Sequence, residues 1–314
     1  MATELMLPNT LAQRAKVKLA FAFNRSYHSN IRNLEFRTYG AWTHILTELV
    51  REISGVFVVP QHVLWFDPDD TDNNPNSSFG STATQSKATV HSRVPDWALV
   101  HATAKPLPNK PQRWKITHHG VPLFVEAKRA ASRKVDLDLG CVLRCVELAQ
   151  QDAITQAAIL FQMHPCQKQV ITIACAGEWW SCRVVKESDV DVVKALINLN
   201  CNTYVPSLPS TEAEVGEDPP GAMELMAEDV MMVPQISLSD EQLAEFADLN
   251  EPDGPYTNSH YLQQELGATD LTLPGDQRWS GLLQMGTRPS NQVWFLINRD
   301  LRAIAGLTVD GPRC

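Results

Sequence analysis

The stretch VPLFVEAKRA, residues 121–130, places a glutamate and a lysine two positions apart at the end of an apolar run. If this run is a β-strand, Glu126 and Lys128 point to one face and Ala127 to the other, because side chains alternate along a strand. Such a pair on an exposed strand is common and contributes under about 1 kcal/mol. The same pair can also be half of a metal-dependent active site. The surrounding sequence is needed to choose between an exposed ion pair and such a site.

A second apolar strand supplies the acid that such a site needs. Residues 95–104, PDWALVHATA, place Asp96 directly before the strand, and a Pro- and Lys-rich segment over 106–115 is predicted to be the turn that follows it. In an antiparallel hairpin the beginning of one strand lies beside the end of the other. We therefore expect the carboxylates of Asp96 and Glu126 to converge on one point, with the Lys128 amine beside it.

These three residues are of the types that hydrolysis of a phosphodiester requires. The reaction needs a divalent cation held by oxygen ligands, an activated water, and positive charge for the developing negative charge. Carboxylates and a backbone carbonyl suit Mg²⁺ or Mn²⁺. Asp96 and Glu126 would hold the ion with help from the Ala127 carbonyl, and Lys128 would position the attacking water.

This arrangement resembles the PD-(D/E)xK phosphodiesterase superfamily, the restriction-endonuclease-like nucleases, with PD at 95–96 and EAK at 126–128. The resemblance covers residues 36–200 and includes an acidic helix before the first strand and a helix after the motif. It implies an α/β fold with a central mixed β-sheet flanked by helices. The activity that it implies is a Mg²⁺-dependent nuclease, endonuclease or exonuclease.

Apolar spacing predicts a helix over 38–54, before the two strands. Its buried stripe centres between Ile45 and Leu49, with Glu52 at the edge and Glu48 just outside, at about 100° per residue. Either glutamate is a candidate for the upstream acid of the superfamily, and the sequence does not separate the two.

A second helix is predicted over 137–163, after the motif. Gln156 borders its stripe of small residues, while Gln150 falls inside the widened apolar face. A buried amide raises the free energy of the fold unless it finds a hydrogen-bond partner. Some members of the superfamily use a glutamine near the substrate, and Gln156 is preferred over Gln150 for that role. The aromatic residue that often follows four positions later is here Leu160.

Composition and hydrophobic patterning divide the 314 residues into four segments. We expect an N-terminal helical arm over 1–35 and the nuclease-like domain over 36–205. Residues 206–277 read as an acidic linker or insertion, partly disordered, and 278–314 as a strand and helix that pack on the core. The stretch WSGLLQMGTRPSNQ within the last segment also resembles proteins expanded in mushroom-forming fungi, which implies no function.

Charge is distributed unevenly. Residues 1–200 hold 22 Lys and Arg against 18 Asp and Glu, whereas residues 201–314 hold 5 against 18. The first part can bind a polyanion, and we expect nucleic acid, DNA rather than RNA, as the partner. Arg129, Arg133 and Lys134, just after the motif, are candidates for phosphate contacts. A homodimer is a further expectation, since many such nucleases act as dimers.

A function of a different class fits the same pattern. The chain can be a catalytically inactive nuclease-fold module whose acidic segment over 206–253 binds a basic partner or covers the basic face. Deleting that segment and measuring DNA affinity against salt would separate autoinhibition from a passive linker.

Other classes of protein are excluded or disfavoured. No stretch reaches the roughly 20 apolar residues of a membrane helix, and the start lacks a secretory signal, so an intracellular protein, nuclear or cytoplasmic, is expected. The 7 cysteines show no CxxC pair, which disfavours a disulfide framework. Cys141 and Cys145 could share a zinc ion, but reduced core cysteines are the more common case. His118 and His119 are predicted to be turn residues.

Overall fold

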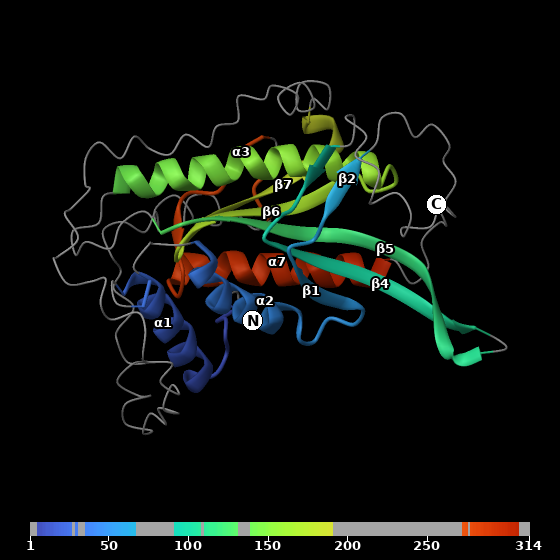
Figure 1. Ribbon diagram of the computed structural model, residues 1–314, viewed down its shortest axis with the longest axis horizontal. Helices are drawn as coiled ribbons and strands as arrows, with labels where there is room; N and C mark the ends of the chain where they lie inside the picture. Colours follow the sequence, from blue (N-terminus) through green and yellow to red (C-terminus); the bar gives the residue numbers. More distant parts are fainter. Residues whose placement is uncertain are drawn as a thin grey trace, which may run out of the picture.

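The structure, a computed structural model, describes residues 5–26, 29–30, 35–66, 91–107, 110–130, 139–190, 272–275 and 277–307. Most of the expected acidic linker lies outside these residues. The described helices and strands form a mixed β-sheet with helices on both faces (Figure 1). The expected α/β class with a mixed sheet is therefore confirmed.

The helical elements are α1 (Leu11–Arg25), η1 (Glu35–Thr38), α2 (Tyr39–Val50), α3 (Leu139–Met163), η2 (Glu187–Asp189) and α7 (Arg288–Leu307). The strands are β1 (Val56–Pro60), β2 (Leu64–Phe66), β3 (His91–Arg93), β4 (Trp97–Leu107), β5 (Lys110–Lys128), β6 (Gln169–Ala176), β7 (Trp179–Lys186) and β8 (Leu283–Gln284). None of the helices in the described ranges is long and apolar enough to cross a membrane.

The six strands of the main sheet have the order β1-β4-β5-β6-β7-β8. Strands β5 and β6 run parallel, because α3 carries the chain from the end of one strand back to the start of the next. The other pairs among the described strands are antiparallel. Strands β4 and β5 therefore have partners on both sides where they cross the centre of the sheet.

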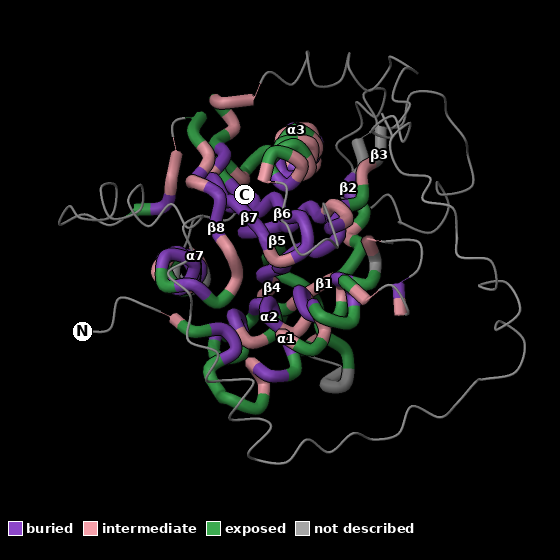
Figure 2. The backbone as a smooth tube through the Cα atoms, turned by 90° about the vertical axis from the view of Figure 1, so that its left-hand side faces the viewer, coloured by how far each residue is buried: buried purple, intermediate pink, exposed green. Residues whose placement is uncertain are grey.

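Different helices cover the two faces of the sheet (Figure 2). Trp97 and Val125 belong to an apolar cluster with α1, α2 and α7. Their chain neighbours Ala98 and Phe124 belong to a second cluster with α3. Because side chains alternate along a strand, Glu126 points to the side of α3.

Four fully buried tryptophans hold α2 and α7 against the sheet. The Trp180 ring of β7 stacks on Trp294 of α7 at 4.5 Å, and Trp42 of α2 meets the Trp180 ring edge-on at 6.5 Å. The Trp42 indole N–H donates to the Gly177 carbonyl at 2.9 Å. The fourth, Trp97 of β4, donates its indole N–H to the Thr43 hydroxyl at 2.9 Å. Aromatic burial thus joins the C-terminal helix to the core made by the first half of the chain.

The hairpin between β4 and β5 is longer than the sequence predicts. A turn is expected over 106–115, but residues 106–107 and 110–115 belong to the two strands, with Pro106 opposite Trp114. The difference arises because the end of this hairpin is a two-stranded ribbon with free outer edges, where the missing N–H of a proline costs little. His118 and His119, also expected in a turn, lie within β5.

The tryptophan cluster makes a stability prediction. Trp294→Ala should lower the free energy of unfolding by about 3–5 kcal/mol, because it removes a large buried side chain and leaves a cavity. Arg299→Ala, at an exposed position on the same helix, should change it by no more than about 0.5 kcal/mol. Urea unfolding followed by far-UV circular dichroism measures both. A loss below about 1 kcal/mol for Trp294→Ala would show that α7 does not contribute to the core as described.

Candidate active site

Two buried carboxyl groups lie where β4 begins and β5 ends. Trp97 pairs with Val125, so Asp96 precedes the paired residue on one strand and Glu126 follows it on the other. Both are nearly buried, with 8% and 7% of their surface exposed. The Ala127 backbone N–H donates to Asp96 Oδ2 at 2.7 Å. The register of the hairpin therefore brings the two predicted acids together.

The Lys128 ammonium lies between two carboxylates. It donates to Glu126 Oε1 at 2.7 Å and forms an ion pair with Asp152 Oδ2 of α3, also at 2.7 Å. Burial alone would lower the pKa of Lys128, but these two carboxylates raise it above its usual range. The lysine therefore stays charged, and its position is fixed from both sides.

A glutamine of α3 completes the contacts of Glu126. Gln156 Nε2 donates to Glu126 Oε2 at 2.7 Å, and the amide oxygen of Gln156 is buried with no hydrogen-bond partner among the described residues. Gln150, the alternative, instead donates to the Ser181 hydroxyl of β7 at 2.8 Å. The structure thus places Gln156, rather than Gln150, at the predicted acid.

The segment before the sheet provides two further polar groups. The Tyr39 hydroxyl, in the first turn of α2, donates to Asp96 Oδ1, and its ring packs at 4.5 Å against Trp97. Four residues earlier, the half-buried carboxyl of Glu35 interacts electrostatically with Asp96 and Glu126. Both groups come from the segment η1–α2, which precedes the strands of the sheet in the chain.

Burial and mutual repulsion make the carboxyl groups hold their protons. Burial raises the pKa of Glu126 to about 7, even though the Lys128 ammonium acts in the opposite direction. Burial, together with repulsion from Asp96, raises the pKa of Glu35 to about 7. Burial also raises the pKa of Asp96, although two hydrogen bonds oppose the rise. A divalent cation would remove the repulsion that favours protonation.

The donor atoms suit a hard cation, but they are not gathered as a finished ligand set. Within the described ranges, no three His, Cys, Asp or Glu side chains are grouped so that they could hold a metal ion. Every carboxylate oxygen of Asp96 and Glu126 accepts a hydrogen bond, and each keeps a further lone pair. The residues that would hold Mg²⁺ or Mn²⁺ are these two acids and the Ala127 carbonyl.

Glu48 and Glu52 are not brought to this site. Glu48 forms an ion pair with Arg51 and accepts a hydrogen bond from Gln13 of α1, while Glu52 pairs with Arg302 of α7 at 3.2 Å. The physical reason is the direction of α2. Its first turn faces the acids, and residue 48 lies about 13 Å further along the axis at 1.5 Å per residue.

The predicted phosphate contacts are only partly described. Arg129 directly follows β5 and is half-buried, within electrostatic reach of Cys145 on α3. Arg133 and Lys134 lie outside the described residues.

Sequence reasoning missed three members of the cluster: Glu35, Tyr39 and Asp152. Asp152 carries a usable signal, since it precedes Gln156 by four residues and therefore shares its helix face. Glu35 and Tyr39 are also four apart, but they precede the apolar stripe that marks the helix. No local pattern links them to strands more than fifty residues later.

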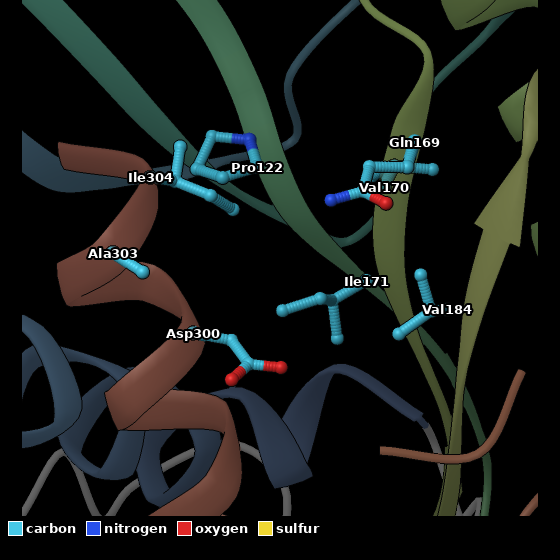
Figure 3. A pocket seen from close by; sticks show the side chains of 8 residues that line it. All are labelled: Pro122, Gln169, Val170, Ile171, Val184, Asp300, Ala303 and Ile304. Carbon is cyan, nitrogen blue, oxygen red and sulfur yellow. The ribbon is translucent and has the colours of Figure 1, made fainter. Parts of the chain in front are cut away.

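A hollow of about 170 Å³ lies elsewhere, between α7 and strands β5 to β7 (Figure 3). Its walls are mainly apolar, with Ile171, Val184 and Ile304 among them, and Asp300 is the acid that lines it. Ile171 belongs to the apolar cluster on the side of α7, opposite to the face that carries Glu126. The hollow is therefore separate from the acid cluster, which we define as Asp96, Glu126 and the side chains that contact them.

Comparisons with models of protein families, with curated proteins and with solved structures find no match for this chain.

The raised pKa of Glu126 predicts an effect of pH on stability. Without metal, folded Glu126 keeps its proton up to a pKa of about 7, whereas the unfolded chain releases it near 4.5. The contribution of protonated Glu126 to the free energy of unfolding is therefore complete below pH 4.5. It is lost as the pH rises through 7. In EDTA, Glu126→Gln should gain about 1–3 kcal/mol of unfolding free energy relative to the wild type between pH 5 and pH 8.

Urea unfolding of both proteins at several pH values measures this difference. Using the difference removes the contribution of groups that titrate in the same way in both proteins. Mg²⁺ should stabilise the wild type at pH 8 and not the variant. A difference that stays constant with pH would contradict the raised pKa.

Proposed function

We propose that this protein is a Mg²⁺- or Mn²⁺-dependent nuclease that hydrolyses phosphodiester bonds in DNA, on a restriction-endonuclease-like fold. The observation that supports this best is the meeting of Asp96, Glu126 and Lys128 at one end of a central hairpin. An α/β sheet flanked by helices is compatible with that fold. Three carboxyl groups here also have raised pKa values, and a bound cation would stabilise their ionised forms.

Each residue has a role that follows from its contacts. Asp96 and Glu126 would hold the cation, which when bound supplies Lewis acidity and activates a water. Lys128 would donate a hydrogen bond to the attacking water and offset the negative charge that develops on the phosphate. Glu35, with a pKa of about 7, has the acidity of a group that accepts a proton near neutral pH.

Three residues orient the others. Tyr39 fixes one oxygen of Asp96 and the Ala127 amide fixes the other. Gln156 orients Glu126 through a hydrogen bond at 2.7 Å. Well-positioned side chains lower the barrier because less ordering remains to be done in the transition state.

The central prediction concerns cleavage. The full-length protein with Mg²⁺ or Mn²⁺ should cut DNA, and EDTA should stop it. Lys128→Ala should slow cleavage by about 10²–10³-fold, because it removes charge stabilisation at the reacting phosphate. Lys168→Ala, which removes an exposed lysine paired with Glu187, should leave the rate unchanged.

Single- and double-stranded DNA and RNA, separated on denaturing gels, measure these rates. Cleavage that persists unchanged in Lys128→Ala would contradict the proposed site. No cleavage of any substrate with either ion would instead favour the inactive interaction module.

Asp152 is predicted to be a positioning residue that acts through Lys128. Asp152→Asn keeps the shape of the side chain but weakens its hold on the ammonium, so kcat should fall by about tenfold while KM changes little. Steady-state kinetics on the preferred substrate measure both constants. A fall as large as that of Lys128→Ala would show that Asp152 contacts the substrate or the ion directly.

A further inference from the structure

Strands β4 and β5 extend past the sheet as a two-stranded ribbon. β1 pairs with β4 only over Trp97–His101, and β6 pairs with β5 only over Leu123–Lys128. Residues 102–107 and 110–120 therefore pair mainly with each other. Figure 1 shows this ribbon reaching away from the body of the protein.

The ribbon is basic without any acid to balance it. Residues 97–125 contain four Lys and Arg and no Asp or Glu. The side chains of Lys105, Arg113 and Lys115 are exposed, and none of them forms an ion pair with a carboxylate among the described residues. Within the described residues, no acidic side chain neutralises the positive charge of the ribbon.

The pairing of the strands places like charges opposite each other. Lys105 pairs directly with Lys115, so both side chains leave the same face of the ribbon. Arg113, two residues from Lys115, lies on that face as well. Like charges directly opposite one another are destabilising. A bound polyanion would remove this repulsion.

The other face of the ribbon is apolar and open. Trp114 is 64% exposed and Ile116 is 57% exposed, and their strand partners are Pro106 and Ala104. Apolar side chains can contact thymine methyl groups and other base edges. The ribbon thus combines phosphate-binding charges with apolar groups that can reach bases.

We propose that the β4–β5 ribbon enters the major groove of double-stranded DNA. A two-stranded ribbon fits this groove, which is about 12 Å wide. The major groove of A-form RNA is too narrow and deep for this. The apolar face, with Trp114 and Ile116, faces the base edges. The long side chains of Lys105, Arg113 and Lys115 on the opposite face reach sideways to the phosphates at the rims of the groove.

The spacing to the acid cluster suits one duplex. Lys115 lies 11 residues before Glu126, which is roughly 35 Å along the strand at about 3.3 Å per residue. One turn of B-DNA is about the same length. This inference rests on the proposed function for the assignment of DNA as the substrate, but binding and cleavage are measured separately.

Binding of the full-length protein to a 30-base-pair duplex, followed by fluorescence anisotropy in EDTA, tests the ribbon without cleavage. The variant Lys105→Ala/Lys115→Ala should bind at least tenfold more weakly near 0.1 M salt. The slope of log affinity against log salt should shrink by about 2, since two phosphate contacts are lost. Trp114→Ala should weaken binding with little change in slope.

Lys168→Ala/Arg299→Ala removes two exposed cations outside the ribbon and should bind like the wild type. Unchanged urea midpoints in the ribbon variants would confirm that they fold. Equal affinity of the wild type and the ribbon variant at every salt concentration overturns the proposal, and is expected if the chain's own acidic residues 206–253 occupy the ribbon. Equal binding of single-stranded DNA overturns the major-groove assignment.

The two proposals fail in different ways. Ribbon-dependent binding without any cleavage would refute the nuclease and support the ribbon. Cleavage together with DNA binding that does not depend on the ribbon would support the nuclease and refute the ribbon.

Discussion

The pairing of Trp97 with Val125 is the constraint on which the candidate site depends. It brings the Ala127 amide to Asp96 and turns Glu126 toward α3. A slip of one residue would move every side chain of β5 to the opposite face, so Glu126 would point into the apolar cluster shared by α2 and α7. The buried tryptophans and the two apolar layers hold this register, because each strand has a different partner helix on each face.

Burying the carboxyl groups of Asp96 and Glu126 is unfavourable by itself, and their neighbours compensate for it. Asp96 and Glu126 are almost entirely buried, although an unpaired buried charge is unfavourable. Hydrogen bonds from Tyr39, Gln156 and a backbone amide, together with the Lys128 ammonium, reduce this penalty, and raised pKa values remove part of the charge. Groups held in this way in a core are common at functional sites, and structural ion-pair networks perturb pKa values as well.

The acids and the proposed DNA-binding ribbon are parts of the same two strands. At one end β4 and β5 are central strands, buried between helices, which keeps Asp96 and Glu126 in fixed positions. At the other end the same strands leave the sheet and expose both faces. One hairpin would therefore connect substrate contact to chemistry without a flexible joint between them.

Local periodicity determined much of this protein: the strand that carries Glu126 and Lys128 on one face, and the long helix that carries Gln156. It placed Asp96 beside Glu126 as well, because a hairpin joins neighbours in sequence. Only the tertiary structure decided which distant groups complete the cluster, bringing Glu35 and Tyr39 to Asp96 and leaving Glu48 and Glu52 elsewhere. The direction of α2 sets that outcome, and it depends on packing against the tryptophan core rather than on any spacing within the helix.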